Sequence, residues 1–166
     1  MPGALRILRR RKPMPDHESY LREATELALA NVAEGGRPYG AVIVRDGEVI
    51  ARAANRIHAT NDPSDHAEMV AIRAASQQLG RPKLDDCIVY ASGRPCPMCH
   101  AAMRLAGVKQ GYFAFTAEEA EAEGLLSAGI YAELCRPLEE QPMQVRHLPL
   151  ADEPSPYRAW AERKGR

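Results

Sequence analysis

"HAEMVAIRAA" (residues 66–75) begins with a histidine and a glutamate and continues with apolar residues at helical spacing. The apolar positions are Ala67, Val70, Ala71, Ala74 and Ala75. Apolar residues that recur every three or four positions lie on one face of a helix, and a glycine often ends such a helix. We therefore predict a helix from His66 to Leu79 that is closed by Gly80.

A second stretch, "GRPCPMC" (residues 93–99), places two cysteines at the start of another predicted helix. It predicts a turn followed by a helix that has Pro97 in its first turn and runs to Gly107. Cys96 and Cys99 are three residues apart, so their side chains point the same way from that helix. Both sulfurs can therefore reach one metal ion at about 2.3 Å.

Together the two stretches supply three predicted metal ligands, which are His66, Cys96 and Cys99. Helix N-termini favour the thiolate form of cysteine, and a tetrahedral zinc with three protein ligands keeps its fourth position for water. Glu68 is placed to take a proton from that water and hand it to a substrate nitrogen. The combination of H-x-E with P-C-x-x-C is typical of zinc deaminases. We predict one catalytic zinc per subunit; a closed structural zinc site is the alternative, and no fourth ligand at motif spacing supports it.

Composition narrows the class of protein. The chain has 166 residues and a formal net charge of zero, so no bulk field attracts it to nucleic acid or to an anionic membrane. It has no run of eighteen apolar residues, which argues against a membrane span. Four cysteines are too few for a disulfide scaffold, and they favour a reducing, cytoplasmic location.

Strand and helix patterns alternate along the rest of the chain. Helices are expected at 16–34, 117–123, 130–134 and 155–163, and strands at 39–44, 49–51, 87–91, 110–115 and 145–148. This order predicts an α/β fold with helices on both faces of one sheet. Residues 1–15 are predicted to form a basic, flexible tail, and residues 16–166 a single zinc-dependent domain.

With these residues in view, the chain resembles the cytidine deaminase-like superfamily, and within it the bacterial guanine deaminase branch. The resemblance is carried by "PYGAVIVRDG", "TNDPSDHAEMVAIRAA", "LDDCIVYAS", "PCPMC" and "SPYRAW". It implies a three-layer α/β/α sandwich with a mixed five-stranded sheet, and a homodimer that exchanges C-terminal segments. It also implies that Asn55 and the backbone N–H of Ala67 bind the substrate ring beside the zinc ligands and the acid/base Glu68.

Several positions depart from the guanine deaminase pattern. Arg94 stands where the resemblance implies a glutamate, Leu105 replaces a tryptophan, and Leu126-Ser127 replaces an aspartate pair. The closing tyrosine is also missing from the end of the sequence. For Arg94 two roles stay open, which are binding an anionic or carbonyl group of the substrate and pairing with an acid of a partner subunit.

The function predicted from these features is zinc-dependent hydrolytic deamination of a free nucleobase-like amino-heterocycle, guanine or a related purine or pterin, with release of ammonia. The alternatives are a tRNA-specific adenosine deaminase and a cytosine-type pyrimidine deaminase. A tRNA enzyme needs clustered Lys and Arg, whereas "TAEEAEAEG" (residues 116–124) is acidic and argues against a nucleic-acid partner. A zinc-stabilised interaction module without turnover is a third class, against which the intact Glu68 weighs.

Overall fold

A computed structural model describes residues 16–125, 128–150 and 153–164. The predicted tail 1–15 and the Leu126-Ser127 departure lie outside the described residues. The contacts within the chain define two compact units, the first ending at Tyr131 and the second beginning at Ala132. The single domain expected for residues 16–166 therefore stays a prediction.

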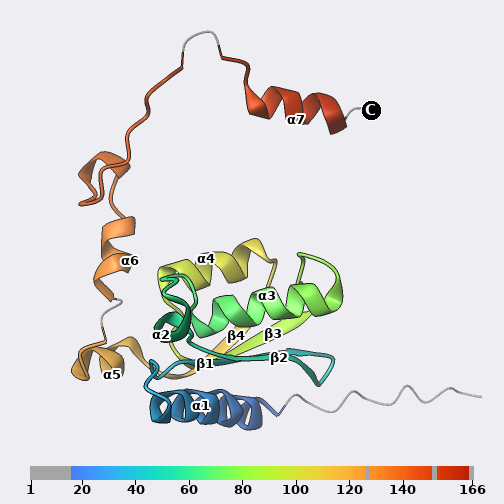
Figure 1. Cartoon of the computed structure of the whole chain (residues 1–166), viewed down its shortest axis with the longest axis vertical. Coiled ribbons are helices and arrows are strands. Elements are labelled where there is room, and N and C mark those ends of the chain that lie inside the picture. Colours follow the sequence, from blue (N-terminus) through green and yellow to red (C-terminus); the bar gives the residue numbers. More distant parts are fainter. Residues whose placement is uncertain (1–15, 126–127, 151–152, 165–166) are drawn as a thin grey trace, which may run out of the picture. The chain divides into compact units, whose positions relative to one another are not determined.

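The first unit contains a four-stranded mixed sheet of order β2-β1-β3-β4 (Figure 1). The strands are β1 (Gly40–Arg45), β2 (Glu48–Ala54), β3 (Cys87–Gly93) and β4 (Gln110–Phe115). β1 pairs antiparallel with both β2 and β3, and β3 pairs parallel with β4. A hairpin turn at Asp46-Gly47 joins β1 to β2, and both of its residues have positive φ angles, as a tight turn between twisted strands requires.

Helices cover both faces of this sheet (Figure 1). α1 packs on one face, and α3 packs on the other with α4 beside it. The helices of the first unit are α1 (His17–Ala33), α2 (Ile57–Thr60), α3 (Ala67–Leu79), α4 (Pro97–Leu105) and α5 (Ala117–Ala122). α6 (Ala128–Leu134) begins in this unit, while the 3-10 helix η1 (Leu138–Glu140) and α7 (Pro156–Lys164) belong to the second unit.

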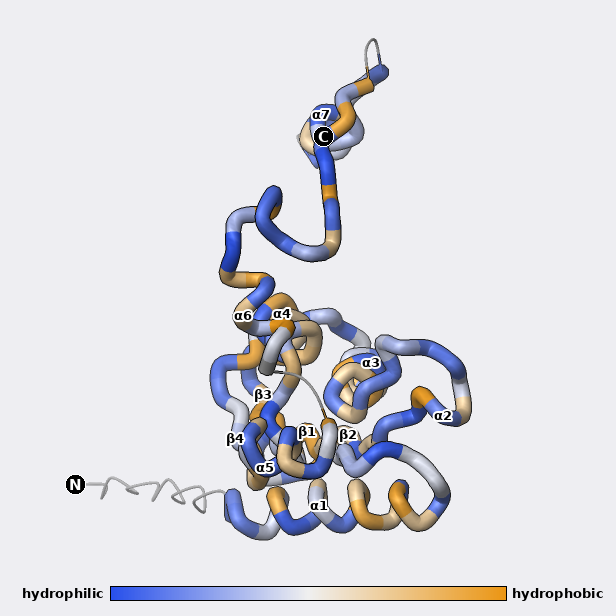
Figure 2. The backbone as a smooth tube through the Cα atoms, turned by 90° about the vertical axis from the view of Figure 1, so that its left-hand side faces the viewer, coloured by the Kyte–Doolittle hydropathy of each residue, from blue (hydrophilic) through white to orange (hydrophobic). Residues whose placement is uncertain are grey.

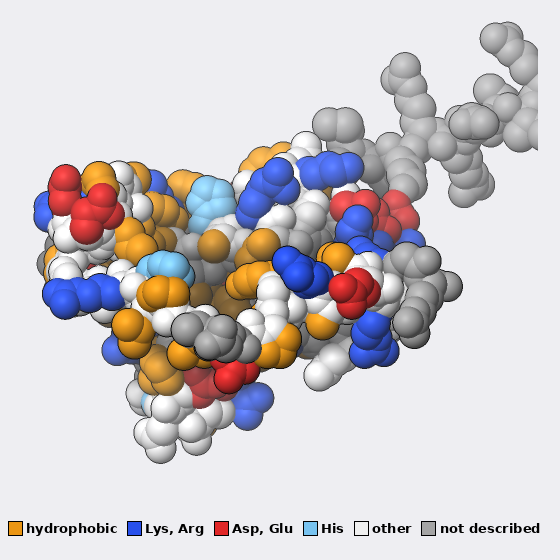
Figure 3. Space-filling view, turned by 90° about the horizontal axis from the view of Figure 1, so that it is seen from above, with side chains coloured by type: hydrophobic (Ala, Val, Ile, Leu, Met, Phe, Trp, Pro, Cys, Tyr) orange, Lys and Arg blue, Asp and Glu red, His pale blue; other side chains and the backbone are white. Residues whose placement is uncertain are grey.

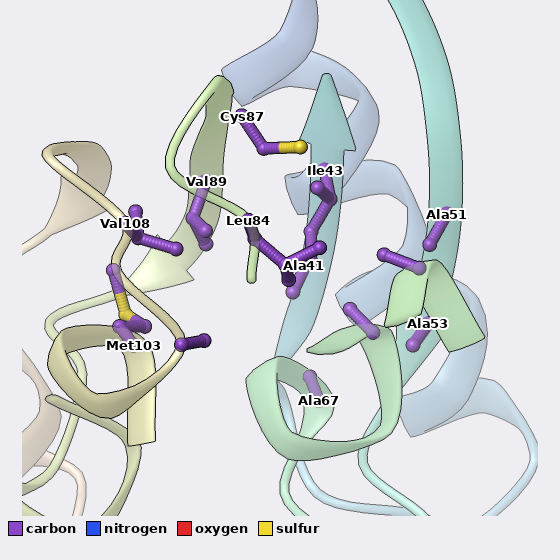
Figure 4. Packing of buried hydrophobic residues seen from close by; sticks show 13 residues of the cluster. Ala41, Ile43, Ala51, Ala53, Ala67, Leu84, Cys87, Val89, Met103 and Val108 are labelled. Atoms are coloured by element: carbon purple, nitrogen blue, oxygen red, sulfur yellow. The ribbon is translucent and has the colours of Figure 1, made fainter. Parts of the chain in front are cut away.

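The hydrophobic core has two halves because side chains of β1 and β3 alternate between the faces of the sheet. On the α3 side, small residues such as Ala41 and Ala67 pack around Ile43 and Val89 (Figure 4). The α1 side is filled by a second set, which comprises Ala24, Val42, Val44 and Tyr90. Along α1 itself, hydrophobic and hydrophilic residues alternate (Figure 2), as expected for a helix with one buried face.

α1 and β1 approach each other closely at Gly40. A Cβ atom built there would lie 2.1 Å from the carbonyl oxygen of Ala24. Asp16 caps α1, since its side chain accepts a hydrogen bond from the backbone N–H of Ser19 at 3.1 Å. The absence of a side chain at Gly40 therefore allows α1 to lie close to β1.

The expected fifth strand is wrong for the part of the chain that the structure describes, where the sheet has four strands. Residues 145–148 have no regular secondary structure. They lie in the second unit, between Pro142 and Pro149, and no strand is described in that unit to accept their backbone hydrogen bonds. A strand pattern without a partner strand does not form a stable strand. Within the described ranges, no helix has both the length and the apolar composition needed to span a membrane.

Candidate metal centre and its surroundings

The predicted ligands come together where two helices begin. His66 is the N-cap residue of α3, and Cys96, which follows β3 and a short turn, is the N-cap residue of α4. Neither side chain makes the usual capping hydrogen bond, so both remain available to a metal. Cys99 lies one turn into α4 and is fully buried. The N-terminal ends of both helices favour negative charge at the sulfurs.

The spacing of the three ligand atoms fits zinc. The Nδ1 atom of His66 lies 3.5 Å from the Sγ atom of Cys96 and 3.6 Å from that of Cys99, and all three atoms lie within 4.8 Å of one another. A tetrahedral zinc with bonds of about 2.3 Å to sulfur and about 2.0 Å to nitrogen separates such atoms by about 3.5 Å. When bound, zinc would lower the pKa of a water in its open position and so supply the nucleophile.

No fourth side chain completes this cluster among the described residues. His100, the nearest rival ligand in the sequence, is exposed, and its backbone N–H is bonded to the carbonyl of Cys96. With these three ligands from the described residues, a tetrahedral zinc would keep one position for water, as catalytic zinc does.

The two cysteine side chains differ in pKa. A hydrogen bond from Cys99, and secondarily the contact with His66, lowers the pKa of Cys96 to about 4. The same hydrogen bond to Cys96, together with burial, raises the pKa of Cys99. Contact with the Cys96 thiolate raises the pKa of His66 despite its partial burial. Without a metal, Cys96 is thus the thiolate and Cys99 the thiol that donates to it. Zinc, which takes both sulfurs as thiolates, would displace the Cys99 proton when it binds.

Glu68 lies in the first turn of α3, two residues after His66, and is only 6% exposed. Burial is the largest cause of the raised pKa of its carboxyl group, and the negative Cys96 adds to it. A carboxyl group whose pKa is shifted towards neutrality both accepts and returns a proton more readily. The structure thus places Glu68 beside the three ligands as the sequence predicts.

Asn55 is 1% exposed and follows β2. Its side-chain oxygen accepts a hydrogen bond from the backbone N–H of Ile57 at 3.1 Å, whereas its side-chain nitrogen is buried without a partner in the described residues. The Nδ2 group is therefore available to donate hydrogen bonds to a ligand. Ala67 is the first residue of α3, so its backbone N–H has no partner within the helix.

Arg94 lies in the turn before Cys96, and its guanidinium carbon lies 4.8 Å from the ring centre of Tyr131. The Tyr131 hydroxyl donates a hydrogen bond of 2.5 Å to the carbonyl of Pro95. Arg94 also lines a cavity of about 560 Å³ with Tyr39, Phe115 and residues of α1 and α5. Leu105, at the position of the expected tryptophan, is 87% exposed. Tyr131 was not predicted, because no sequence pattern signals a contact across 36 residues.

The sheet, the helices and the ligand cluster together are those of the zinc-dependent deaminases. Residues 14–115 match the family described as the cytidine and deoxycytidylate deaminase zinc-binding region. The chain belongs to this family, and it is a zinc-dependent hydrolytic deaminase.

Individual relatives refine the comparison. The chain is 42% identical over 146 residues to the guanine deaminase of Bacillus subtilis (strain 168), which covers 87% of this chain and 94% of that protein. The X-ray structure of guanine deaminase from Bacillus subtilis superposes with a TM-score of 0.84 at 41% identity, over 89% of this chain and 94% of that one. A tRNA-specific adenosine deaminase of Agrobacterium fabrum is 41% identical over 92 residues, 53% of this chain and 60% of that protein.

Proposed function

We propose that this enzyme removes an amino group from a free nucleobase-like ring, guanine or a related purine or pterin, and releases ammonia. The observation that carries the proposal is the extent of similarity. The likeness to a guanine deaminase runs through nearly the whole of both chains, whereas the likeness to a tRNA adenosine deaminase spans about half of this chain. This difference in extent supports a free nucleobase over tRNA as the substrate.

Each candidate residue has a role in this reaction. His66, Cys96 and Cys99 would hold the zinc. Glu68 takes one proton from the attacking water and gives it to a ring nitrogen as the C–O bond forms. It then carries a second proton, from the added hydroxyl, to the amine, so that the C–N bond breaks, ammonia leaves and one water is consumed. The low exposure of Glu68 keeps bulk water from competing for these transfers.

The ring is recognised by hydrogen-bond donors. The free Nδ2 group of Asn55 and the N–H of Ala67 both donate, so the substrate must present acceptors, such as a carbonyl oxygen or an unprotonated ring nitrogen, to them. Arg94 adds a positive charge two residues before the ligand Cys96, where a glutamate is expected. We infer that substrates with an oxo or anionic group on that side are preferred over those with a second amino group.

A substrate panel tests the proposal. Ammonia release is measured with guanine, adenine, cytosine, their nucleosides, pterins and triazines, and with tRNA. Turnover of a free bicyclic amino-ring well above all nucleosides and tRNA is expected. Turnover confined to tRNA would establish the adenosine deaminase alternative, turnover of cytosine alone the pyrimidine alternative, and no turnover by zinc-loaded enzyme an interaction module.

Surface charge is consistent with a small-molecule substrate. On the face shown in Figure 3, Lys and Arg side chains are interspersed with Asp and Glu side chains. α5 adds the exposed acids Glu118, Glu119 and Glu121. A polynucleotide requires a clustered basic surface, and the acids of α5 argue against one on this helix.

We further propose a homodimer that exchanges C-terminal segments, located in the cytoplasm as the cysteine pattern predicts. The second unit supports the dimer because its apolar residues are uncovered, with Leu148, Tyr157 and Trp160 at least 61% exposed. Such residues are commonly buried against a partner. Light scattering on the purified protein should give twice the chain mass of 18.3 kDa.

A further inference from the structure

Asn31, in the last turn of α1, is one of the few buried polar residues of the described chain, with 6% exposure. Its side-chain nitrogen donates two hydrogen bonds, one of 2.7 Å to the carbonyl of Arg37 and one of 3.0 Å to the carbonyl of Asn55. A single amide thus ties the end of α1 to the following loop and to a residue 24 positions away. Nothing in the sequence pattern of α1 indicates this contact.

The loop after α1 is shaped around this amide. The backbone N–H of Gly36 donates to the carbonyl of Asn31 at 2.8 Å. A Cβ atom on residue 36 would lie 2.4 Å from the side-chain nitrogen of Asn31 and 2.6 Å from its side-chain oxygen. Residue 36 must therefore be glycine while the amide keeps its position.

Asn55 is held at three points. Its backbone N–H donates to the carbonyl of Tyr39 at 3.0 Å, its carbonyl accepts from Asn31, and its side-chain oxygen accepts from the N–H of Ile57. The remaining polar group of the residue is the buried Nδ2, which has no partner in the described chain. A donor fixed in this way loses little freedom when it binds a ring, and a displacement of 1 Å would weaken that bond.

We propose that Asn31 is a positioning residue for substrate recognition, which holds the backbone of Asn55 so that the free Nδ2 group is presented to an acceptor of the ring. This inference rests on the substrate-binding role proposed for Asn55. A purely structural Asn31 would contribute to stability without any specific link to Asn55. The two cases differ in whether the effects of changing Asn31 and Asn55 are coupled.

Two independent variants perturb the contact. Asn31→Leu removes both donors at similar volume, and Gly36→Ala displaces the amide while leaving Asn31 in place. Each is expected to raise KM about tenfold for guanine, or for the fastest substrate of the panel, with kcat within about threefold and zinc content unchanged. In an Asn55→Ala background the same changes should alter KM less than about twofold, because the group that they position is gone.

Ser92→Ala is the matched control. Ser92 is 3% exposed, and its hydroxyl accepts a hydrogen bond from the N–H of Gly40 at 3.0 Å. The factor by which Ser92→Ala changes KM should be the same in the parent and in the Asn55→Ala background. If Asn55→Ala raises KM but Asn31→Leu and Gly36→Ala raise it by an equal factor in both backgrounds, the positioning role is overturned and the role of Asn55 stands. An Asn55→Ala enzyme with the KM of the parent would overturn both.

Discussion

The most informative single change is Glu68→Gln, which keeps the size of the side chain and removes its ability to carry a proton. Glu68 is not one of the three clustered ligands, so zinc should remain bound. Because the residue is 6% exposed, bulk water has little access to replace the carboxylate. The variant therefore isolates proton transfer from metal binding.

The size of the effect follows from the number of transfers. One positioned acid or base contributes about 10²–10⁴-fold, and Glu68 serves both the attacking water and the departing amine. We expect kcat to fall by at least about 10⁴-fold, which corresponds to about 5 kcal/mol of activation free energy. Glu68→Ala should likewise retain zinc and abolish ammonia release.

The assay combines initial rates of ammonia release with zinc content from elemental analysis. Glu121→Gln, an exposed acid of α5, serves as a control and should keep the parent rate. A Glu68→Gln enzyme that holds zinc and retains more than a tenth of the parent kcat would refute the acid/base role. Loss of zinc from this variant would instead show that the carboxylate belongs to the metal site.

Three further predictions concern recognition and stability. Arg94→Glu should shift the substrate profile towards rings with an additional amino group. As a control, Arg104→Glu on the exposed side of α4 should leave the profile unchanged. If Arg94→Glu has the same substrate profile as the parent, Arg94 has only its contact with Tyr131. Gly40→Ala should lower the free energy of unfolding by at least about 2 kcal/mol in urea titrations, because the new methyl group meets the backbone of α1; unchanged stability would contradict that packing. Burial raises the pKa of Tyr90 to about 12. The contribution of the neutral Tyr90 to the free energy of unfolding is therefore present below pH 10 and is lost as the pH rises towards 12. Urea titrations across that range should show about 2 to 3 kcal/mol more loss in the parent than in Tyr90→Phe, and parallel curves would argue against the shift.

The metal centre was predictable from sequence because each half of it is local. Cys96 and Cys99 are three residues apart, so the spacing sets their common direction. His66 and Glu68 are two residues apart, and His66 is the extended N-cap residue before the first turn of α3 that carries Glu68. The helices themselves were predictable for the same reason, and α3 ends at Gly80 as its pattern indicates, with that glycine in the left-handed conformation.

Features that depend on distant partners were not predictable. The link from Asn31 to Asn55 and the packing of Arg94 on Tyr131 arise only when separate segments meet. The expectation of a strand at 145–148 failed because four residues of sequence cannot tell whether a partner strand is present. The sequence does not predict α2, since four residues are too short for a periodic pattern.

The central claim is that one imidazole and two sulfurs hold a zinc ion whose remaining position is taken by solvent. Zinc content together with X-ray absorption spectroscopy of the purified enzyme tests it most directly. The account predicts one zinc per chain, coordinated by two sulfurs at about 2.3 Å and by two lighter atoms, one of which is lost as a histidine signal in His66→Ala. A protein free of transition metal, or a zinc with a third sulfur or a second histidine among its ligands, would contradict it.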